Sequence, residues 1–149
     1  MSRSALRGFD SERFAAARVA AGMSRGDLAR LAAPLSAVTI QRWENGTTSP
    51  QIDILRRALD RLGVAAEQVL ITDPEDRFLS DYRHLRLMTQ AELAGAAGLD
   101  TTTVQRLERA ERPITQHAAD AIAHVLEISP DQVHDAYERA RTRPPGTPA

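Results

Sequence analysis

Apolar residues recur three and four positions apart along most of the chain, a spacing that predicts amphipathic helices. In residues 36–45, one face carries Ile40, Trp43 and Glu44 when successive residues are turned by about 100°. The opposite face carries Val38, Gln41, Arg42 and Asn45. Residues 102–109 divide in the same way, with Val104, Leu107 and Glu108 inside and Thr102, Gln105, Arg106 and Arg109 outside. Each stretch therefore predicts a helix with one buried and one polar face.

Residues that cap helices divide the chain into short segments. In the first half, predicted helices begin at Asp10 or Ser11, Ser24, Ser36 and Ser49-Pro50, and a short fifth helix covers about 66–70. In the second half, the matching starts are Asp73-Pro74, Thr89, Asp100 or Thr101, Thr115 and Ser129-Pro130. The sequence therefore predicts an all-α fold in which a set of five helices occurs twice.

The chain also matches itself at a period of about 65 residues. Arg18, Met23 and Leu28 align with Arg83, Met88 and Leu93, and after a gap of one residue Thr39, Arg42 and Glu44 align with Thr103, Arg106 and Glu108. We therefore expect a first domain over residues 9–72 and a second over 73–141. Residues 142–149 hold three prolines and a glycine, and we expect them to be a disordered tail.

The composition excludes several classes of protein. There is no cysteine among the 149 residues, which rules out disulfides, thiolate catalysis and cysteine-bound zinc. All 19 basic residues are arginine, so lysine chemistry is excluded as well. The sequence contains no glycine-rich phosphate loop, and the spacing of its residues suggests no nucleophile with a matching general base. We therefore expect neither enzymatic activity nor a cofactor.

Location and metal binding can also be addressed from the sequence. No apolar run approaches the roughly 18 residues of a membrane span, and the first ten residues have no apolar signal core. We expect a cytoplasmic protein without a membrane partner. The four histidines, His84, His117, His124 and His134, lack the spacing of metal ligands, so we expect surface positions and no metal site.

Charge is distributed unevenly between the two halves. Residues 1–72 hold ten arginines and seven acidic residues, a net charge of +3, whereas residues 73–149 hold nine arginines and thirteen acidic residues, a net charge of −4. If the chain binds nucleic acid, the surface that faces the phosphates should therefore be more positive in the first half.

The glutamate on each inner helix face needs a partner, because an unpaired buried carboxylate is costly. Arg18 and Arg83 occupy equivalent positions on the first helix of each copy. We therefore expect two structural ion pairs, Arg18 with Glu44 and Arg83 with Glu108.

Each copy contains a set of residues that is typical of one family. In the first copy they are Arg18, Ser24, Leu28-Ala29, Thr39-Ile40, Trp43-Glu44, Gly46, Pro50 and Leu62-Gly63-Val64. In the second copy they are Thr89-Gln90, Glu92-Leu93-Ala94, Val104, Glu108 and Arg112-Pro113. Through these residues both copies resemble the phage-repressor type of helix-turn-helix domain, the Cro and xenobiotic-response-element family. The resemblance implies two tandem five-helix, lambda-repressor-like domains in a nucleoid-associated protein. In each domain, the third helix enters the major groove and the second lies across the phosphate backbone.

Carried over position by position, the resemblance assigns candidate DNA-binding residues on the third helix, on its flanks and at the start of the second helix. In the first copy they are Arg25, Ala37, Val38, Thr39, Gln41, Arg42, Asn45 and Thr47. In the second copy they are Gln90, Thr101, Thr102, Thr103, Gln105, Arg106 and Arg109. The candidates for phosphate contact are Arg25, Asn45, Thr47, Gln90 and Arg109. An arginine can fork onto guanine O6 and N7, and Val38 or a threonine methyl can contact a thymine methyl.

Three functions remain open at this point, the last of which is a scaffold in which neither copy binds DNA. The first is a transcriptional repressor that reads a bipartite, asymmetric operator with both copies. In the second, only the first copy reads DNA, and the acidic second copy is a homodimerisation or protein-partner module, as in an antitoxin-like regulator. The second copy departs from the family pattern because Ala110 stands where the first copy has the stop glycine Gly46.

Overall fold

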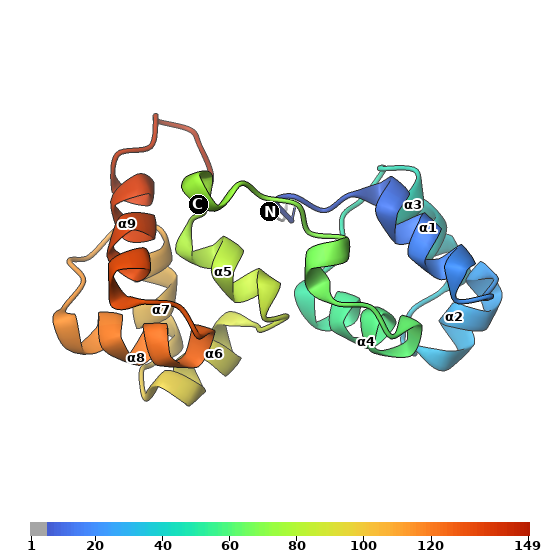
Figure 1. Cartoon of the computed structure of the whole chain (residues 1–149), viewed down its shortest axis with the longest axis horizontal. Helices are drawn as coiled ribbons and strands as arrows, with labels where there is room; N and C mark the ends of the chain where they lie inside the picture. Colours follow the sequence, from blue (N-terminus) through green and yellow to red (C-terminus); the bar gives the residue numbers. More distant parts are fainter. Residues whose placement is uncertain (1–5) are drawn as a thin grey trace. The chain divides into compact units, whose positions relative to one another are not determined.

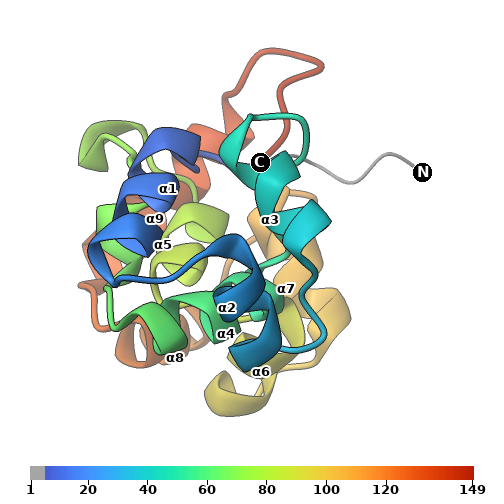
Figure 2. The ribbon, with the colours of Figure 1, turned by 90° about the vertical axis from the view of Figure 1, so that its right-hand side faces the viewer.

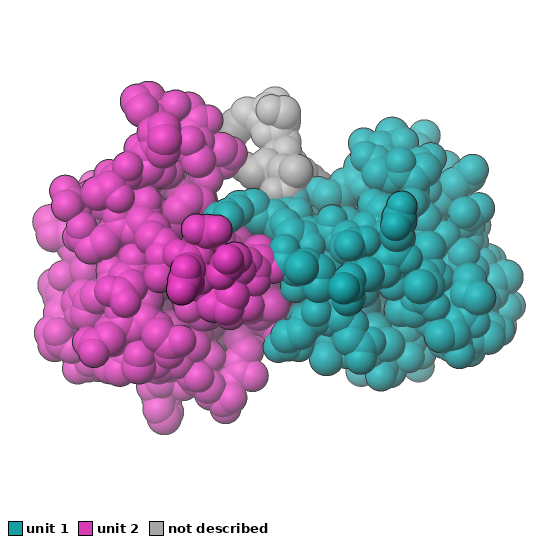
Figure 3. Space-filling view, turned by 45° about the horizontal axis from the view of Figure 1, so that its top comes forward, with its two compact units in different colours: residues 1–71 teal, residues 72–149 magenta. Residues whose placement is uncertain are grey.

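The computed structural model describes residues 6–149, and over these residues the chain is helical with no strand. The predicted all-α class is confirmed. The chain divides into two compact units at Ile71 and Thr72 (Figures 1 and 3). Residues up to Ile71 form unit 1, and residues from Thr72 onward form unit 2.

Unit 1 contains four α-helices and a short 3-10 helix within its described part. They are α1 (Ser11–Ala20), α2 (Arg25–Leu31), α3 (Ala37–Glu44), α4 (Ile52–Leu62) and η1 (Ala66–Gln68). Asp10, Ser24 and Ser36 cap the first three helices, each accepting a hydrogen bond from the backbone three residues further on. Helix α3 packs against α1 and α2, and Figure 2 shows these helices at the front of the view.

Unit 2 begins with a 3-10 helix and continues with five α-helices. They are η2 (Pro74–Asp76), α5 (Leu79–Leu85), α6 (Gln90–Ala97), α7 (Thr101–Glu108), α8 (Gln116–Leu126) and α9 (Pro130–Arg141). Thr89, Asp100, Thr115 and Ser129 cap α6, α7, α8 and α9. After α9, Thr147 N–H donates to Pro144 O, within the segment for which the sequence predicts disorder.

Two of the sequence-based predictions for element starts are wrong. Asp73-Pro74 begins η2, and the first α-helix of unit 2, α5, starts only at Leu79, where Asp81 accepts from Phe78 N–H at 2.8 Å. Ser49 does not cap α4, because its Oγ accepts from Leu6 N–H instead. The short fifth helix expected over about 66–70 is present as the 3-10 helix η1, whereas its counterpart α9 has 12 residues.

The core of unit 1 is built around a cluster of aromatic rings. Phe14 and Trp43 meet edge to face with their ring centroids 5.6 Å apart, and Phe9 packs against both. Ile40 of α3 and Leu28 of α2 have no exposed surface. The inner face predicted for residues 36–45 is therefore the face that fixes α3 to the rest of the unit.

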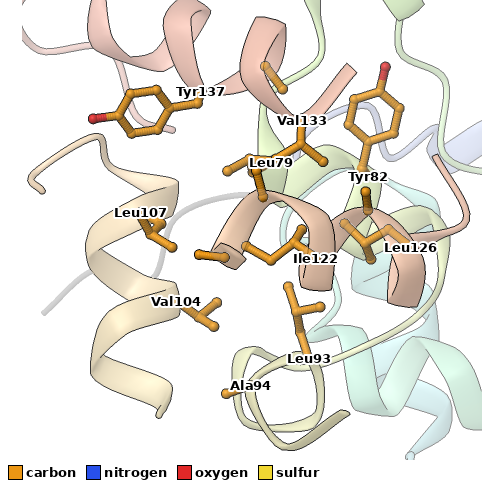
Figure 4. Close-up of a cluster of buried hydrophobic side chains, with 14 residues drawn as sticks. Leu79, Tyr82, Leu93, Ala94, Val104, Leu107, Ile122, Leu126, Val133 and Tyr137 are labelled. Atoms are coloured by element: carbon orange, nitrogen blue, oxygen red, sulfur yellow. The ribbon is translucent and has the colours of Figure 1, made fainter. Parts of the chain in front are cut away.

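The core of unit 2 contains aliphatic residues from all five of its α-helices (Figure 4). Val104 and Leu107 point from α7 into this cluster, toward Ile122 of α8. Tyr137 of α9 lies at its edge. Helix α7 is thus held by its inner face, as α3 is in unit 1.

The two copies end three of their helical segments in the same left-handed conformation but with different residues. Gly22, Gly46 and Gly63 have φ of 74°, 78° and 68° in unit 1. The equivalent positions of unit 2 carry side chains, with φ of 55°, 55° and 56° at Leu87, Ala110 and Glu127. Since glycine alone adopts this conformation without a steric cost, unit 2 carries strain that unit 1 avoids.

Candidate nucleic-acid interface

Helix α3 presents its polar face to solvent. Ile40 and Trp43 are buried, whereas Val38 in the first turn is 56% exposed although it is apolar. The other residues assigned to this face are exposed, apart from the half-buried Thr39: Ala37, Gln41, Arg42, Asn45 and Thr47. Single exposed apolar side chains are ordinary on protein surfaces, so the exposure of Val38 shows only that its methyl groups are available for contact with an apolar group.

Helix α7 repeats this arrangement. Val104, Leu107 and Glu108 are buried, and the first turn and the arginines face outward. Thr101, Thr102, Arg106 and Arg109 are exposed, and Thr103 and Gln105 are half-buried. Arg42 and Arg106 are therefore exposed arginines at the sixth position of α3 and of α7, the third α-helix of each unit.

A two-point ion pair holds α3 in unit 1. Arg18 Nε donates to Glu44 Oε2 at 2.6 Å and Arg18 Nη2 donates to Glu44 Oε1 at 2.8 Å, while Nη1 donates to Met23 O. Burial works to raise the pKa of Glu44, but the hydrogen bonds from Arg18 and Arg25 outweigh it, and the pKa is lowered. The carboxylate stays charged and ties α3 to α1.

Unit 2 has the same clamp. Arg83 Nε donates to Glu108 Oε2 at 2.7 Å and Arg83 Nη2 donates to Glu108 Oε1 at 3.0 Å, while Nη1 donates to Met88 O. Arg83 and Glu108 are both buried, at 6% and 3% exposure. This pair joins α5 to the end of α7 and sets the axial position of α7.

The residues expected to contact phosphate at the start of the second helix bind the same glutamates. Arg25 Nε donates to Glu44 Oε1 at 3.1 Å, and Gln90 Nε2 donates to Glu108 Oε1 at 2.9 Å. The Arg25 side chain remains 44% exposed, so its charge is held at the amino end of α2 and is accessible from solvent. Unit 1 therefore has one more fixed positive charge at this corner than unit 2.

The turns that follow α3 and α7 have different hydrogen bonds. In unit 1, Thr47 N–H donates to Asn45 Oδ1 at 2.9 Å, which closes a small polar turn. In unit 2, Arg109 O accepts from Arg143 Nη1 at 2.9 Å, so the C-terminal segment is bonded to the end of α7. Arg143 was not among the residues that the sequence assigned to the site, because this contact spans 34 positions.

One histidine is not where the sequence places it. His84 was expected at the surface, but it is half-buried on α5 and its Nδ1 is a buried atom. Burial, with a smaller effect from the Arg83 charge, lowers the pKa of His84 to about 3. The ring is therefore neutral at physiological pH.

Over residues 6–149, no three His, Cys, Asp or Glu side chains gather in a way that could hold a metal ion. No helix in this range has both the length and the apolar character needed to span a bilayer.

Comparison with known families identifies these two units. A family described as helix-turn-helix, of the Cro/C1 type, matches the chain twice, over residues 14–69 and 79–133. The chain belongs to this family. The matches fall one in each unit and include α2 with α3 and α6 with α7, and the family is one of DNA-binding transcription regulators. No curated protein and no solved structure matched the chain significantly.

Proposed function

We propose that this helix-turn-helix protein is a transcriptional repressor that binds a bipartite operator with both units. The proposal rests on the exposed faces of α3 and α7, which are alike in the two units. On each helix an exposed arginine, Arg42 or Arg106, follows a first turn that is also exposed to solvent. A helix of about this width fits the major groove, and its first turn reaches the base edges.

Base reading is assigned to the first turns and the two arginines. Arg42 and Arg106 each fork onto a guanine, and Val38, which is 56% exposed, contacts a thymine methyl. The remaining reading residues are Ala37, Thr39, Gln41, Thr101, Thr102, Thr103 and Gln105. Because Val38 and Thr102 differ in chemistry at equivalent positions, the operator is expected to be asymmetric.

Phosphate contacts are assigned to the corners around these helices. In unit 1 they are Arg25, Asn45 and Thr47, and in unit 2 they are Gln90 and Arg109. The bond from Arg25 to Glu44 supports this role, since it holds a charged guanidinium at the amino end of α2, where backbone N–H groups also favour an anion.

Unit 2 is acidic as a whole, but eight of its thirteen acidic residues are outside α5, α6, α7 with its cap, and the loop after α7. They are on η2, α8 and α9 and the turns beside them, at Asp73, Glu75, Asp76, Asp120, Glu127, Asp131, Asp135 and Glu138. On α7, Glu108 is paired with Arg83. The remaining charges on α7 and its flanks are three exposed arginines, Arg106, Arg109 and Arg112, against Asp100 and Glu111. The local charge therefore supports DNA reading by unit 2 over the alternative in which this unit binds only a protein partner.

Joining two DNA-reading units in one chain raises the affinity of the whole chain for an operator with two half-sites. Once one unit is bound, the second meets its half-site at an effective concentration in the mM range. A single chain then acts as a covalent equivalent of a repressor dimer.

The test is selection from a random double-stranded DNA library by the full chain near physiological salt, followed by affinity measurements on the enriched sequence. Arg42→Ala and Arg106→Ala should each weaken binding by about 1–3 kcal/mol and relax one base pair, in different half-sites. Arg61→Ala on α4 and Arg141→Ala on α9 remove exposed arginines from other helices and serve as matched controls.

The outcomes separate the hypotheses. If only Arg42→Ala weakens binding and the selected motif is a single short half-site, unit 2 is a partner module. If neither variant differs from its control, α3 and α7 are not the readers and the proposal is wrong.

A further inference from the structure

The loop after α7 places an arginine beside the first turn of that helix. Arg112 Nη1 donates to Thr103 Oγ1 at 3.0 Å, although the residues are nine positions apart. Thr103 is the third residue of α7, within the turn that would face base edges. We propose that Arg112 is a specificity-determining residue of unit 2, which reads a base pair with its guanidinium while Thr103 orients it. The inference rests on the proposed function.

Charged groups around the first turn of α7 fit this role. Asp100 caps the helix by accepting from Thr103 N–H at 2.7 Å. Hydrogen bonds from Thr103 lower the pKa of Asp100, and the charges of Arg112 and Arg106 lower it further. Both guanidinium groups therefore lie close enough to the amino end of α7 to act on the same short stretch of DNA.

The backbone of this loop is anchored from α9. Tyr137 donates its hydroxyl hydrogen to Arg112 O at 2.8 Å, and Tyr137 is itself 7% exposed. Figure 4 shows its ring at the edge of the core with the hydroxyl directed away from Val133. At the other end of the loop, Arg143 Nη1 donates to Arg109 O and to Ala140 O, at 2.9 and 2.6 Å. The loop is thus fixed to the core at two points.

Unit 1 has no such arrangement. Its loop after α3, residues 45–50, contains no arginine. Thr39, the equivalent of Thr103, shares a hydrogen bond of 2.9 Å with Ser36 Oγ instead. Unit 1 also lacks an α-helix equivalent to α9 in its described part, where η1 has three residues. The anchored arginine is therefore a feature that distinguishes the second reader from the first.

The chemistry points to guanine. A guanidinium has five N–H donors, and the bond to Thr103 uses one of them. A fork of two parallel N–H groups remains for guanine O6 and N7, and a lysine ammonium lacks this rigid planar geometry. Because the loop backbone is already fixed, less conformational entropy is lost when the side chain binds.

The experiment uses the full chain and the operator that it selects. Affinities are measured for that operator and for every single base-pair change in the half-site of unit 2. Arg112→Ala should lower affinity for the selected operator about 10-fold or more and abolish discrimination at one base pair. Arg112→Lys should keep part of the affinity and discriminate less at this base pair, because the ammonium lacks the planar fork. Arg141→Ala, which removes an exposed arginine on α9, should behave as the wild type.

Two further variants test how Arg112 is oriented. Thr103→Val keeps the branched shape but removes Oγ1, so discrimination should fall at the same base pair as in Arg112→Ala. Combined with Arg112→Ala it should add little, because both changes remove one contact. Tyr137→Phe removes only the hydroxyl that holds Arg112 O and should weaken discrimination at this base pair by a smaller factor. Circular dichroism confirms that each variant is folded.

Three results distinguish the possibilities. If Arg112→Ala binds every sequence as the wild type does while Arg106→Ala is impaired, the inference is wrong and the proposed function stands. If Arg112→Ala weakens binding equally on all sequences, Arg112 is a phosphate contact and the inference is overturned. If the full chain selects no sequence at all, the proposed function fails and this inference falls with it.

Discussion

The strain at the end of α8 can be removed by one substitution. Glu127 closes α8 with φ of 56°, where unit 1 has Gly63 with φ of 68°. A Cβ at Gly63 would meet no atom within 4 Å, so the cost at this kind of position comes from the backbone and not from crowding. We predict that Glu127→Gly is more stable than Glu127→Ala.

The magnitude follows from two opposing effects. A left-handed conformation costs a residue with a Cβ about 1–2 kcal/mol, and glycine avoids that cost. Against this, glycine makes the unfolded chain more flexible, which costs about 0.4–1 kcal/mol. The net gain of Glu127→Gly over Glu127→Ala is therefore about 1 kcal/mol. Alanine is the reference because both variants lose the exposed ion pair between Glu127 and Arg86.

Urea unfolding of the full chain, followed by far-ultraviolet circular dichroism, measures the difference. In a thermal scan, about 1 kcal/mol corresponds to a shift of roughly 4–8 °C for a unit of this size. Gly63→Ala is the reciprocal control and should lose a similar amount. It can be followed by the fluorescence of Trp43, the only tryptophan, which lies in unit 1. If Glu127→Gly is no more stable than Glu127→Ala, the strain argument is refuted.

Three further predictions concern pH, the buried clamp and the junction. His84 is neutral when folded, with a pKa of about 3 against about 6.5 unfolded, so its contribution to stability is complete above pH 6.5 and falls by about 2 kcal/mol by pH 5. His84→Gln should flatten this part of the stability profile in urea titrations. Glu108→Ala should cost about 3–5 kcal/mol in the same assay, because it leaves Arg83 buried without its partner. Ile71 N–H is bonded to Gly8 O of unit 1 and Thr72 Oγ1 accepts from Arg77 of unit 2, so the junction between the units is short. Inserting Gly-Ser between Ile71 and Thr72 lengthens it and should allow more half-site spacings in DNA selection. Selection of one unchanged spacing would contradict this.

The starts of most helices could be predicted because the signals are local. Ser24, Thr89 and Asp100 each bond to a backbone N–H three residues away, and only the neighbouring sequence is needed to see this. The prediction was wrong at Ser49, whose hydroxyl bonds to Leu6 N–H, 43 positions away. It was also wrong at Asp73, where a real cap begins a 3-10 helix and not the first α-helix of the unit.

The candidate site, too, could be predicted from the sequence only in part. The buried and exposed faces of α3 and α7 follow from helical periodicity, and the need for a cation beside Glu44 follows from its position on the inner face. The contact of Arg112 with Thr103 could not be found from the sequence, since it depends on how the loop turns back along α7. The burial of His84 was missed for a similar reason, because an isolated histidine gives no periodic signal.

The two units share the proposed reading helices, α3 and α7, and differ in what supports them, and this difference bears on the form of the proposed operator. In unit 1 the chain after η1 bonds back to the N-terminal segment, with Asp10 N–H donating to Val69 O at 2.8 Å. In unit 2 the corresponding length of chain forms α9, which anchors the loop that carries Arg112. An exposed Val38 in one reader and an anchored Arg112 in the other favour different base pairs. Two copies that differed only at positions far from the proposed reading helix and its loops would read nearly the same half-site, whereas copies that differ on this helix and in the loop after it are suited to two different ones. A strictly palindromic selected motif would therefore argue against reading by one chain and for a dimer in which the same unit of each chain binds DNA.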